Sequence, residues 1–375
     1  MMDMKVSRND LDGAFSVVRD CTTGQGAMMT AHVLFRPTTS GGYDLLATNS
    51  RNFGSVPLVG SVTTGAAVPF TVEAKRLGNW LKAVAADATI TFKVDNGKIS
   101  ASTTRGKVVF SSLDPAQFPF WDGRVAECKA AGTIQASRLG NLLRHGKHFI
   151  SDQEHRMPHL CVAQARDGAL FSTDQTAVAV TTSEVLKGCS FRFHFRDIGA
   201  IINFIAGVQD DGTVEVLEHD NFCMLRRADG ATIAATRFAA NFPSLNIGKD
   251  SIDQQWWVMD KDELSSAIQY VSASAAWDDK RITLKRVGDR AYLTMKAAAG
   301  DPVTADVFVG GFEVGSGAAE DIQFSVSSDH LLKVLAVMGA DQVKIGINQR
   351  GKAGWLRFRE DRDGDDYLTV LTWMA

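Results

Sequence analysis

The stretch TVEAKRLGNWLKAVAADATITFKVDNGKISASTTRGKVVFSSLDPAQFPFW, from Thr71 to Trp121, decides the fold. Its first part has apolar residues at positions i, i+3, i+4 and i+7, the stripe of an amphipathic helix. These residues are Leu77, Trp80, Leu81 and Val84. Its second part alternates apolar and polar residues from Ile90 onward and contains an Asn-Gly dipeptide at 96–97, which is typical of a hairpin turn. The stretch therefore predicts a helix followed by antiparallel strands.

The same pattern recurs along the chain. Helices with a similar stripe are predicted at Phe195–Val208 and Ser327–Gly339, and alternating strands follow each of them. An earlier helix is predicted in each unit, beginning near residues 8, 136 and 260, which gives a period of about 125 residues. The first of these helices has Ser7 as its predicted N-cap. Six helices, two per unit, and strands between them predict an α+β fold of three repeated domains.

Two pairs of nearly identical short sequences support the repeat. AQFP ends at Pro119 and ANFP at Pro243, one period apart; RLGNWL begins at Arg76 and RLGNLL at Arg138, half a period apart, which implies that each unit is itself a duplicated helix-plus-sheet half. Polar, turn-rich segments lie between the units and are typical of linkers. We therefore place the domains at residues 1–125, 131–248 and 254–375.

Composition excludes several classes of protein. Hydrophobic residues make up 45% of the chain and charged residues 22%, and the net charge is −3, so the overall field does not attract a polyanion. The N-terminus lacks the apolar core of a signal peptide, and no apolar run is long enough to span a membrane. The five cysteines are scattered without a CxxC pair, which favours buried thiols in a reducing cytoplasm.

Five segments carry a resemblance to a known family. They are SSLDPAQFP (Ser111–Pro119), LFSTDQTAVAV (Leu170–Val180), RFAANFPSL (Arg237–Leu245), DVFVGG (Asp306–Gly311) and DIQFSVSSDHLLKVL (Asp321–Leu335). Their order, with the three repeats, resembles the bacterial sliding clamp, the beta subunit of DNA polymerase III, as a divergent member. The resemblance implies three clamp domains per chain, each with two helices packed on antiparallel sheets, and a head-to-tail homodimeric ring. It further implies a processivity factor in DNA replication, associated with the nucleoid, without catalysis or a cofactor.

Such a ring needs basic side chains that attract phosphates without reading bases. The helix from Ile134 carries Lys, Arg and His and no acid, and the helix from Thr71 carries a second basic group. The resemblance adds Arg156, from the loop 151–159. The predicted contacts to double-stranded DNA are Lys75, Arg76, Lys82, Arg138, Arg144, Lys147, His148 and Arg156. The alternative is that these charges only solvate the outer faces of the helices.

The resemblance also implies a pocket between the second and third domains for a short apolar peptide of DNA polymerase subunits and the clamp loader. The matching positions are Leu160, Thr173, Gln175, Thr176, Ala177, Val178, Pro243, Val370, Leu371, Trp373 and Met374. For Leu160, Val178, Val370 and Leu371 the alternative is ordinary strand core. The family's Gly-His-Arg-Leu is replaced here by residues 175–178, so the partner's peptide is expected to differ.

The dimer contact is matched in the same way. Val108 and Phe110, on the last strand of the first domain, are expected to meet Ala273 and Ser274 on the first helix of the third domain of another copy. Alanine and serine bury little apolar area, so we expect a weaker ring than larger residues would give.

Chemistry-bearing motifs are scarce. His155, His159 and Cys161 are residue types that bind metals, but Pro158 interrupts the helix that would align them, so no metal site is predicted. No serine or cysteine lies in a nucleophile motif. The sequence therefore favours a sliding clamp. The alternatives are a clamp-fold adaptor that binds proteins without encircling DNA, and a hydrolase on an all-β scaffold.

Overall fold

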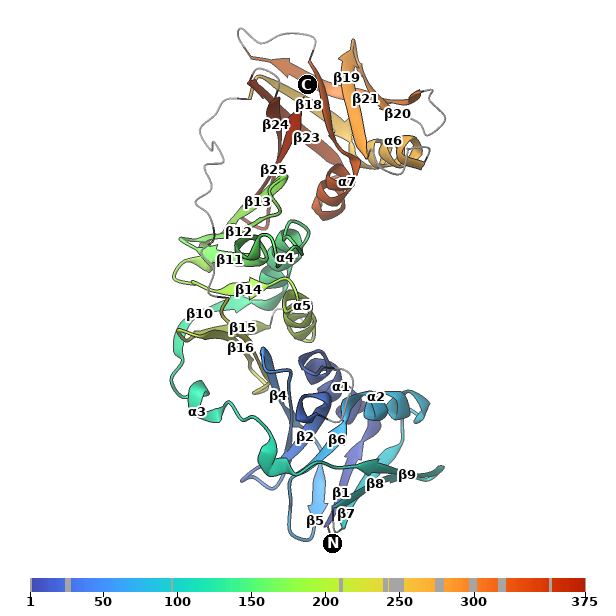
Figure 1. Cartoon of the computed structure of the whole chain (residues 1–375), viewed down its shortest axis with the longest axis vertical. Helices are drawn as coiled ribbons and strands as arrows, with labels where there is room; N and C mark the ends of the chain where they lie inside the picture. The colour runs from blue at the N-terminus through green and yellow to red at the C-terminus, as the bar shows by residue number, and fades with distance from the viewer. Residues whose placement is uncertain are drawn as a thin grey trace. The chain divides into compact units, whose positions relative to one another are not determined.

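The structure is a computed structural model, which describes residues 2–23, 28–95, 97–208, 212–238, 242, 253–273, 280–296, 302–315, 322–350 and 353–374. Contacts divide the chain into two compact units (Figure 1). Unit 1 comprises residues 1–140 and 189–238, and unit 2 comprises residues 141–188 and 239–375. This division into two units does not test the three domains expected from the sequence, so their boundaries remain a prediction.

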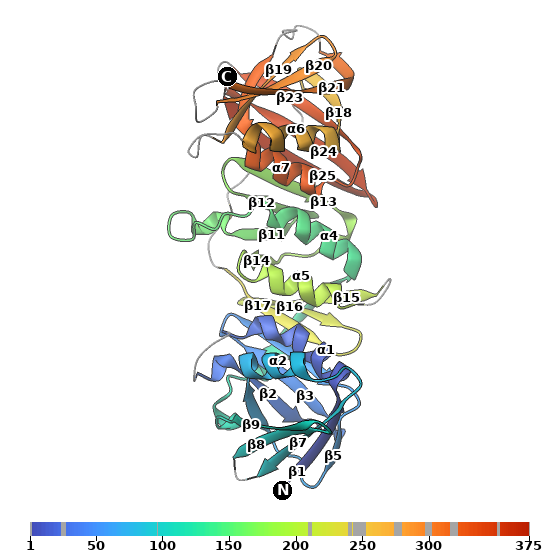
Figure 2. The ribbon, with the colours of Figure 1, turned by 90° about the vertical axis from the view of Figure 1, so that its right-hand side faces the viewer.

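Unit 1 contains two antiparallel sheets, whose strand orders are β5-β1-β7-β8-β9 and β10-β15-β16-β17-β4-β3-β2-β6. Helices α1 and α2 pack together beside these strands (Figure 2). The strands are β1 (Met2–Ser7), β2 (His32–Pro37), β3 (Tyr43–Thr48), β4 (Asn52–Leu58), β5 (Val62–Thr64), β6 (Phe70–Glu73), β7 (Thr89–Asp95), β8 (Lys98–Thr103), β9 (Gly106–Ser111), β10 (Lys129–Gln135), β14 (Arg192–His194), β15 (Thr213–Glu218), β16 (Phe222–Arg227) and β17 (Thr232–Thr236). The helices are α1 (Arg8–Val18), α2 (Ala74–Ala83), α3 (Asp122–Val125) and α5 (Ile198–Ala206), and α4 (Ala136–Lys147) runs from unit 1 into unit 2. The short 3-10 helices of this unit are Arg19–Cys21, Met29–Ala31 and Pro115–Gln117.

The helices form where the apolar stripes predict them. Ser7 caps α1 by accepting a hydrogen bond from the N–H of Asp10 at 3.0 Å, which confirms the predicted N-cap. The buried face of α1 is the predicted stripe of Leu11, Ala14, Phe15 and Val18. In α2, Leu77 and Leu81 are fully buried, whereas Trp80 is only half-buried. Packing of these stripes onto the sheets therefore fixes both helices.

Strands β4 and β17 pair with each other, and we call this pair the first junction, because it joins the first repeat to the second. Ala234 lies opposite Phe53 in it. The linker after β9 covers one face of this pair with Phe118 and Trp121, which are 3% and 5% exposed. The ring of Trp121 stacks on Phe53 with centroids 5.8 Å apart and meets Phe222 edge-on at 5.3 Å. The linker is thus held by aromatic packing.

The strands of unit 2 pair in one continuous antiparallel sheet. Their order is β11-β12-β13-β25-β22-β19-β20-β21-β18-β23-β24, and β24 also pairs with β25. The pair β13–β25 is the second junction. The strands are β11 (Val162–Arg166), β12 (Ala169–Thr173), β13 (Ala177–Thr182), β18 (Gln255–Asp260), β19 (Arg281–Val287), β20 (Arg290–Lys296), β21 (Pro302–Val314), β22 (Gln323–Ser327), β23 (Gln342–Arg350), β24 (Ala353–Arg362) and β25 (Asp365–Met374). The helices are α6 (Lys261–Ala273) and α7 (Ser328–Val337), with 3-10 turns at Pro158–Leu160 and Glu184–Leu186.

The core of unit 2 lies between its strands and the apolar faces of α6 and α7. Trp257, Leu264 and Leu331 are among its buried members. Strand β21 is unusual because one run of 13 residues pairs with β20 through 302–308 and with β18 through 309–314. In unit 1 two separate strands make the corresponding pairings: β4 pairs with β3, and β5 pairs with β1.

The six predicted helices correspond to α1, α2, α4, α5, α6 and α7, and α3 is an additional short helix. The predicted Asn-Gly turn includes residue 96, which lies outside the described residues. No helix within the described ranges is long and apolar enough to cross a membrane.

Candidate functional site

The second junction begins with a tight turn at residues 173–177. The Oγ1 hydroxyl of Thr173 donates to the carbonyl of Ala177 at 2.7 Å, and Oδ1 of Asp174 accepts from the N–H groups of Thr176 and Ala177 at 3.0 and 2.9 Å. Gln175, at the exposed tip, has a φ of 81°. An aspartate that binds the following backbone N–H groups stabilises such a turn and offsets the left-handed residue.

A helix and a strand fasten this turn from outside. Nε2 of His330, in the first turn of α7, lies 2.8 Å from Oδ2 of Asp174. Burial alone would raise the pKa of Asp174, but the hydrogen bonds from His330, Ala177 and Thr176 outweigh it and lower that pKa. Thr372 of β25 donates its N–H to the carbonyl of Thr176 at 2.9 Å. The turn is therefore a fixed point of the junction.

The junction has two faces. Ala177 and Leu371 lie opposite each other and are fully buried in the core of unit 2. The residues next to them, Val178 and Val370, point to the opposite face, because side chains alternate along a strand. We call this face, with its rows on β13, β25 and β24, the outer face of the second junction.

A cavity of about 110 Å³ opens on this outer face. Its apolar lining is Val180 and Leu368, which lie opposite each other. Arg359 forms a two-pronged ion pair with Asp366, at 2.8 and 3.0 Å, along its rim. Arg357 also lines the cavity and lies 3.3 Å from the buried carboxylate of Asp253. An apolar floor with a few charged groups at its edge is the usual make-up of a small binding site.

The predicted pocket residues are distributed over both faces and the turn. Val178 and Val370 lie on the outer face; Thr173, Gln175 and Thr176 form the turn; and Leu160 is buried. Ala177 and Leu371 belong to the core, as the alternative of ordinary strand core predicts for Leu371. Pro243 and the side chains of Trp373 and Met374 lie outside the described residues. The sequence prediction did not include Val180 and Leu368, although counting two residues along from Val178 and Val370 would have found them.

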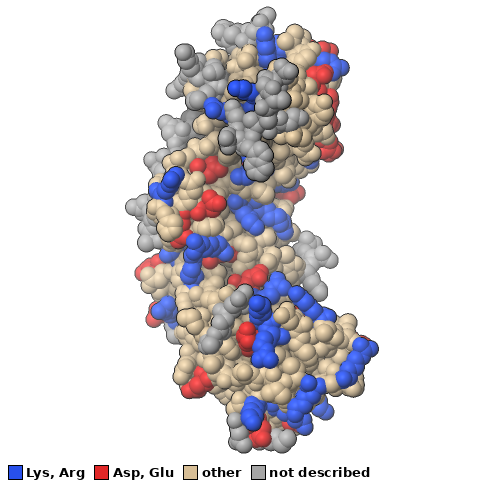
Figure 3. Space-filling model, turned by 45° about the vertical axis from the view of Figure 1, so that its right-hand side comes forward, with Lys and Arg blue, Asp and Glu red and all other residues tan. Residues whose placement is uncertain are grey.

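The predicted DNA contacts lie on helices and a loop. Lys75, Arg76 and Lys82 on α2 are exposed, as are Arg144, Lys147 and His148 near the end of α4, and Arg156 in its loop. Arg138 is half-buried. Neither helix contains an acidic residue. Figure 3 shows one face of the molecule, on which Lys and Arg outnumber Asp and Glu over the lowest part of unit 1.

His145, on the same helix, behaves differently from its basic neighbours. It is buried, with Nδ1 and Nε2 each 3.0 Å from a threonine hydroxyl, those of Thr181 and Thr369. Burial, with the nearby charges of Arg362 and His148, lowers the pKa of His145 to about 3. The imidazole is therefore neutral at pH 7 and is a structural group.

The residues predicted for the dimer contact do not all reach the surface. Phe110 is 2% exposed and packs edge-on against Trp80 at 5.9 Å, whereas its neighbour Val109 is 54% exposed. Val108 is half-buried and Ala273 is exposed. Ser274 lies outside the described residues.

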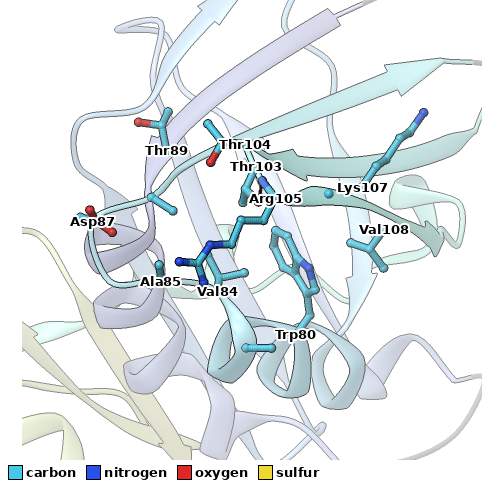
Figure 4. A pocket seen from close by; sticks show the side chains of 13 residues that line it. Trp80, Val84, Ala85, Asp87, Thr89, Thr103, Thr104, Arg105, Lys107 and Val108 are labelled. Atoms are coloured by element: carbon cyan, nitrogen blue, oxygen red, sulfur yellow. Dashed lines mark hydrogen bonds between the residues drawn. The ribbon is translucent and has the colours of Figure 1, made fainter.

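Beside β9, a cavity of about 610 Å³ lies between the end of α2 and the β8–β9 turn. Figure 4 shows Arg105 reaching from this turn over Val84, with Trp80 at one wall and Lys107 pointing outward. Asp87 is an acidic group in the lining. The hollow thus adjoins the edge strand β9, which carries Lys107, and the turn before it, which carries Arg105.

Several strand edges have no partner among the described strands. Strands β5, β6, β9 and β10 each end a sheet of unit 1, and residues 302–308 of β21 pair on one side only, with β20. An open edge presents a row of unpaired backbone groups and favours pairing with another chain.

Comparison with known proteins identifies the fold. No family model and no curated protein matches the sequence. Solved structures match over the whole chain, and the fold they share is the sliding-clamp fold. Among them are the DNA polymerase III beta subunit of Pseudomonas aeruginosa (17% identity, TM-score 0.82, 99% of both chains covered). The others are the clamp of Bartonella birtlesii bound to griselimycin (16%, 0.85) and the beta subunit of Thermotoga maritima (14%, 0.86), with 100% of both chains covered in each comparison.

The fold predicted from the repeats is therefore confirmed: the chain has the fold of a bacterial DNA polymerase III beta sliding clamp, at low sequence identity.

Proposed function

We propose that the protein is a DNA polymerase sliding clamp. Two copies would join head to tail into a ring that encircles duplex DNA and tethers a polymerase and other replication proteins in the cytoplasm. The observation that carries this proposal is that β9 and the first half of β21 are two of the open strand edges in a chain with the clamp fold. Strand β9 pairs with the strand before it, as β17 and β25 do, and so does the first half of β21, as β4 and β13 do. Strands β17 and β25 pair with β4 and β13 at the two junctions.

The internal junctions give the register of this contact. We match Ala234 of β17 and Val370 of β25 with Val109 of β9, because each lies on the outward side of the second strand of its hairpin; their hairpin partners are Met224, Arg357 and Ser100. Ala234 pairs with Phe53, and Val370 pairs with Val178.

On the receiving strand, we match Pro302 with Phe53 and Val178, because each is the first described residue of its strand that pairs with the strand before it, opposite Lys296, Thr48 and Thr173. The same register therefore sets Val109 of one copy opposite Pro302 of the other, and Lys107 opposite Thr304. Val109, Lys107, Pro302 and Thr304 are on the exposed sides of their strands. Lys107 would then lie diagonally from Asp306, which adds a favourable charge pair.

The basic helices supply the contact with DNA. Cations on α2 and α4, with no acid on either helix, attract phosphates and carry no geometry for reading base edges. Binding of this kind is independent of sequence and allows a ring to slide. The proposal assigns no catalytic role to any residue.

The outer face of the second junction supports the second part of the proposal. Its apolar floor and fixed turn suit an extended peptide with apolar side chains, which we assign to polymerase subunits and to the clamp loader that opens the ring.

Topology provides the test. The protein is loaded onto nicked circular DNA with a clamp loader and ATP, and the DNA is then cut once. Loss of protein on cutting, with retention on the uncut circle, is the expected result. Equal retention on both forms contradicts the ring, and no retention on either form, with peptide binding intact, favours the adaptor.

A further inference from the structure

The two junctions begin with the same turn. Thr48 donates its hydroxyl to the carbonyl of Asn52 at 2.7 Å, as Thr173 does to Ala177. Oδ1 of Asn49 accepts from two N–H groups, at 3.0 and 2.7 Å, as Oδ1 of Asp174 does. Ser50 has a φ of 71°, close to the 81° of its counterpart at 175. The junctions are therefore built alike at backbone level.

Each turn is also fastened alike by its backbone. The carbonyl of Arg51 accepts from the N–H of Thr236 at 2.9 Å, as that of Thr176 accepts from Thr372. The contact with a helix is made at different positions: Asn52, the last residue of the first turn, donates to Asp197 directly before α5 at 3.0 Å, whereas Asp174, the second residue of the second turn, is bonded to His330 in α7. The faces beyond the turns can thus be compared position by position.

The register pairs the residues of the two outer faces. Phe53 and Ala234 of the first junction correspond to Val178 and Val370 of the second. On the neighbouring strand, Phe222 and Met224 correspond to Trp355 and Arg357.

At the first junction the chain itself fills this face. Trp121 lies between Phe53 and Phe222, and Arg124 lies over its ring at 5.6 Å. Between β9 and β10 the described linker residues form no strand. The linker backbone is bonded to β6 at Leu113, whose N–H and C=O lie 2.8 and 3.0 Å from the hydroxyl of Thr71, and beyond that point Phe118 and Trp121 pack on the sheet. At the second junction the AQFP motif recurs as ANFP, and Phe242 packs on Phe171 with centroids 6.4 Å apart. The two residues after that motif are Ser244 and Leu245, where the first linker has Phe120 and Trp121.

We propose that the linker segment 115–121 is an internal ligand. Phe118 and Trp121 occupy, within the chain, a pocket of the same kind as the partner pocket at the second junction, so that partners find one of two equivalent junctions open. This inference rests on the proposed function, because it takes the pocket at the second junction to be the site that binds partner peptides. The ligand class is an extended peptide with two aromatic anchors three residues apart, and the first junction accepts it once its own tryptophan is withdrawn.

The test uses the segment itself as the probe. A fluorescein-labelled peptide LDPAQFPFWD, residues 113–122, is titrated against Trp121→Ala and against the unchanged protein, both also carrying Leu368→Arg to disable the second junction. We expect at least about tenfold tighter binding to the Trp121→Ala protein, because an aromatic anchor in a fitted pocket supplies much of a peptide's affinity. The same peptide with alanine for its tryptophan should lose that binding.

Circular dichroism shows whether each variant is folded, and Trp121→Leu, which copies the residue of the second linker, is the milder replacement if alanine unfolds the chain. Equal binding to both folded proteins, or binding that does not require the peptide's tryptophan, overturns the inference. Retention on circular DNA is measured on Trp121→Ala without Leu368→Arg. A ring retained on DNA by a protein that binds no peptide rejects the internal ligand alone, whereas peptide binding without retention rejects the ring alone.

Discussion

Nε2 of His145 lies 3.0 Å from the hydroxyl oxygen of Thr369, so that a buried imidazole of α4 is hydrogen-bonded to β25 across the second junction. The other ring nitrogen is bonded to Thr181 on β13. A neutral imidazole can donate once and accept once, and threonine hydroxyls can do either. Protonation would put an uncompensated charge into this site.

Acid should therefore loosen unit 2. The pKa of His145 is about 3 in the folded chain, against the ordinary histidine value of 6.5 when the chain is unfolded, so the unfolded state binds more protons between these values. The free energy of unfolding should fall as pH decreases from 6.5 toward 3, by up to about 1.4 kcal/mol per pH unit. Urea unfolding at several pH values measures it. His145→Gln should remove most of this slope, and an unchanged slope would contradict the assignment.

The turn carboxylate of the second junction should matter more than its counterpart. Asp174→Ala removes the acceptor of two N–H groups and the partner of His330, and should cost about 1–3 kcal/mol in unfolding free energy. Asp174→Asn should cost less, because an asparagine holds the same turn at residue 49. Asn49→Ala is the matched control for the turn bonds alone. Chemical denaturation compares the three, and an equal loss in Asp174→Asn and Asp174→Ala would contradict this account.

The proposed ring contact predicts a sensitive position on β9. Val109→Glu should convert the dimer to monomer, since the new carboxylate would replace the apolar contact of Val109 with Pro302 of the other copy. Val287→Glu is the control, because Val287 is equally exposed, at 54%, but lies on β19 rather than on an open edge. Light scattering after size exclusion at low micromolar concentration gives the masses. A dimer that survives Val109→Glu would reject the register, and a tight dimer of the unchanged protein would contradict the weaker ring expected from Ala273 and Ser274.

Salt dependence tests the DNA contacts. Arg144→Glu with Lys147→Glu should weaken binding to duplexes of any sequence, and should reduce the slope of log affinity against log salt by about 1 for each phosphate that is no longer neutralised. Lys187→Glu, which changes an exposed lysine outside α2 and α4, is the control. Fluorescence anisotropy across a salt series measures the slope. An equal effect of the control would mean that general charge, rather than α4, governs binding.

The sequence predicts the helices well because their stripes are unambiguous. In α2 the buried residues Leu77 and Leu81 are four apart, with polar residues on the opposite face, so that only one face can enter the core. The repeat supplies the rest of the fold, because a second and third copy of the same helix and hairpin leave few arrangements for the strands.

The site could be predicted only in part, because alternation fails where both faces of a strand are apolar. Val108, Val109 and Phe110 are all apolar, and nothing in the order of these residues says that Phe110 turns inward to Trp80 while Val109 faces solvent. The same ambiguity hides the difference between Ala177, in the core, and Val178, on the outer face. A shift of one residue exchanges the faces, and long-range pairing decides between them.

The uninterrupted strand β21 has a mechanical consequence. Because residues 302–308 and 309–314 are one backbone with different neighbours, tension applied at the open edge is transmitted directly to β18 and thence to β23. In the proposed ring this edge would separate when the ring opens, and one continuous strand resists bending there more than two strands joined by a turn would. In unit 1 the corresponding strands β4 and β5 are separated by a turn, and β4 is paired with β17 at the first junction, so tension on β4 is not carried to β5 along one continuous strand.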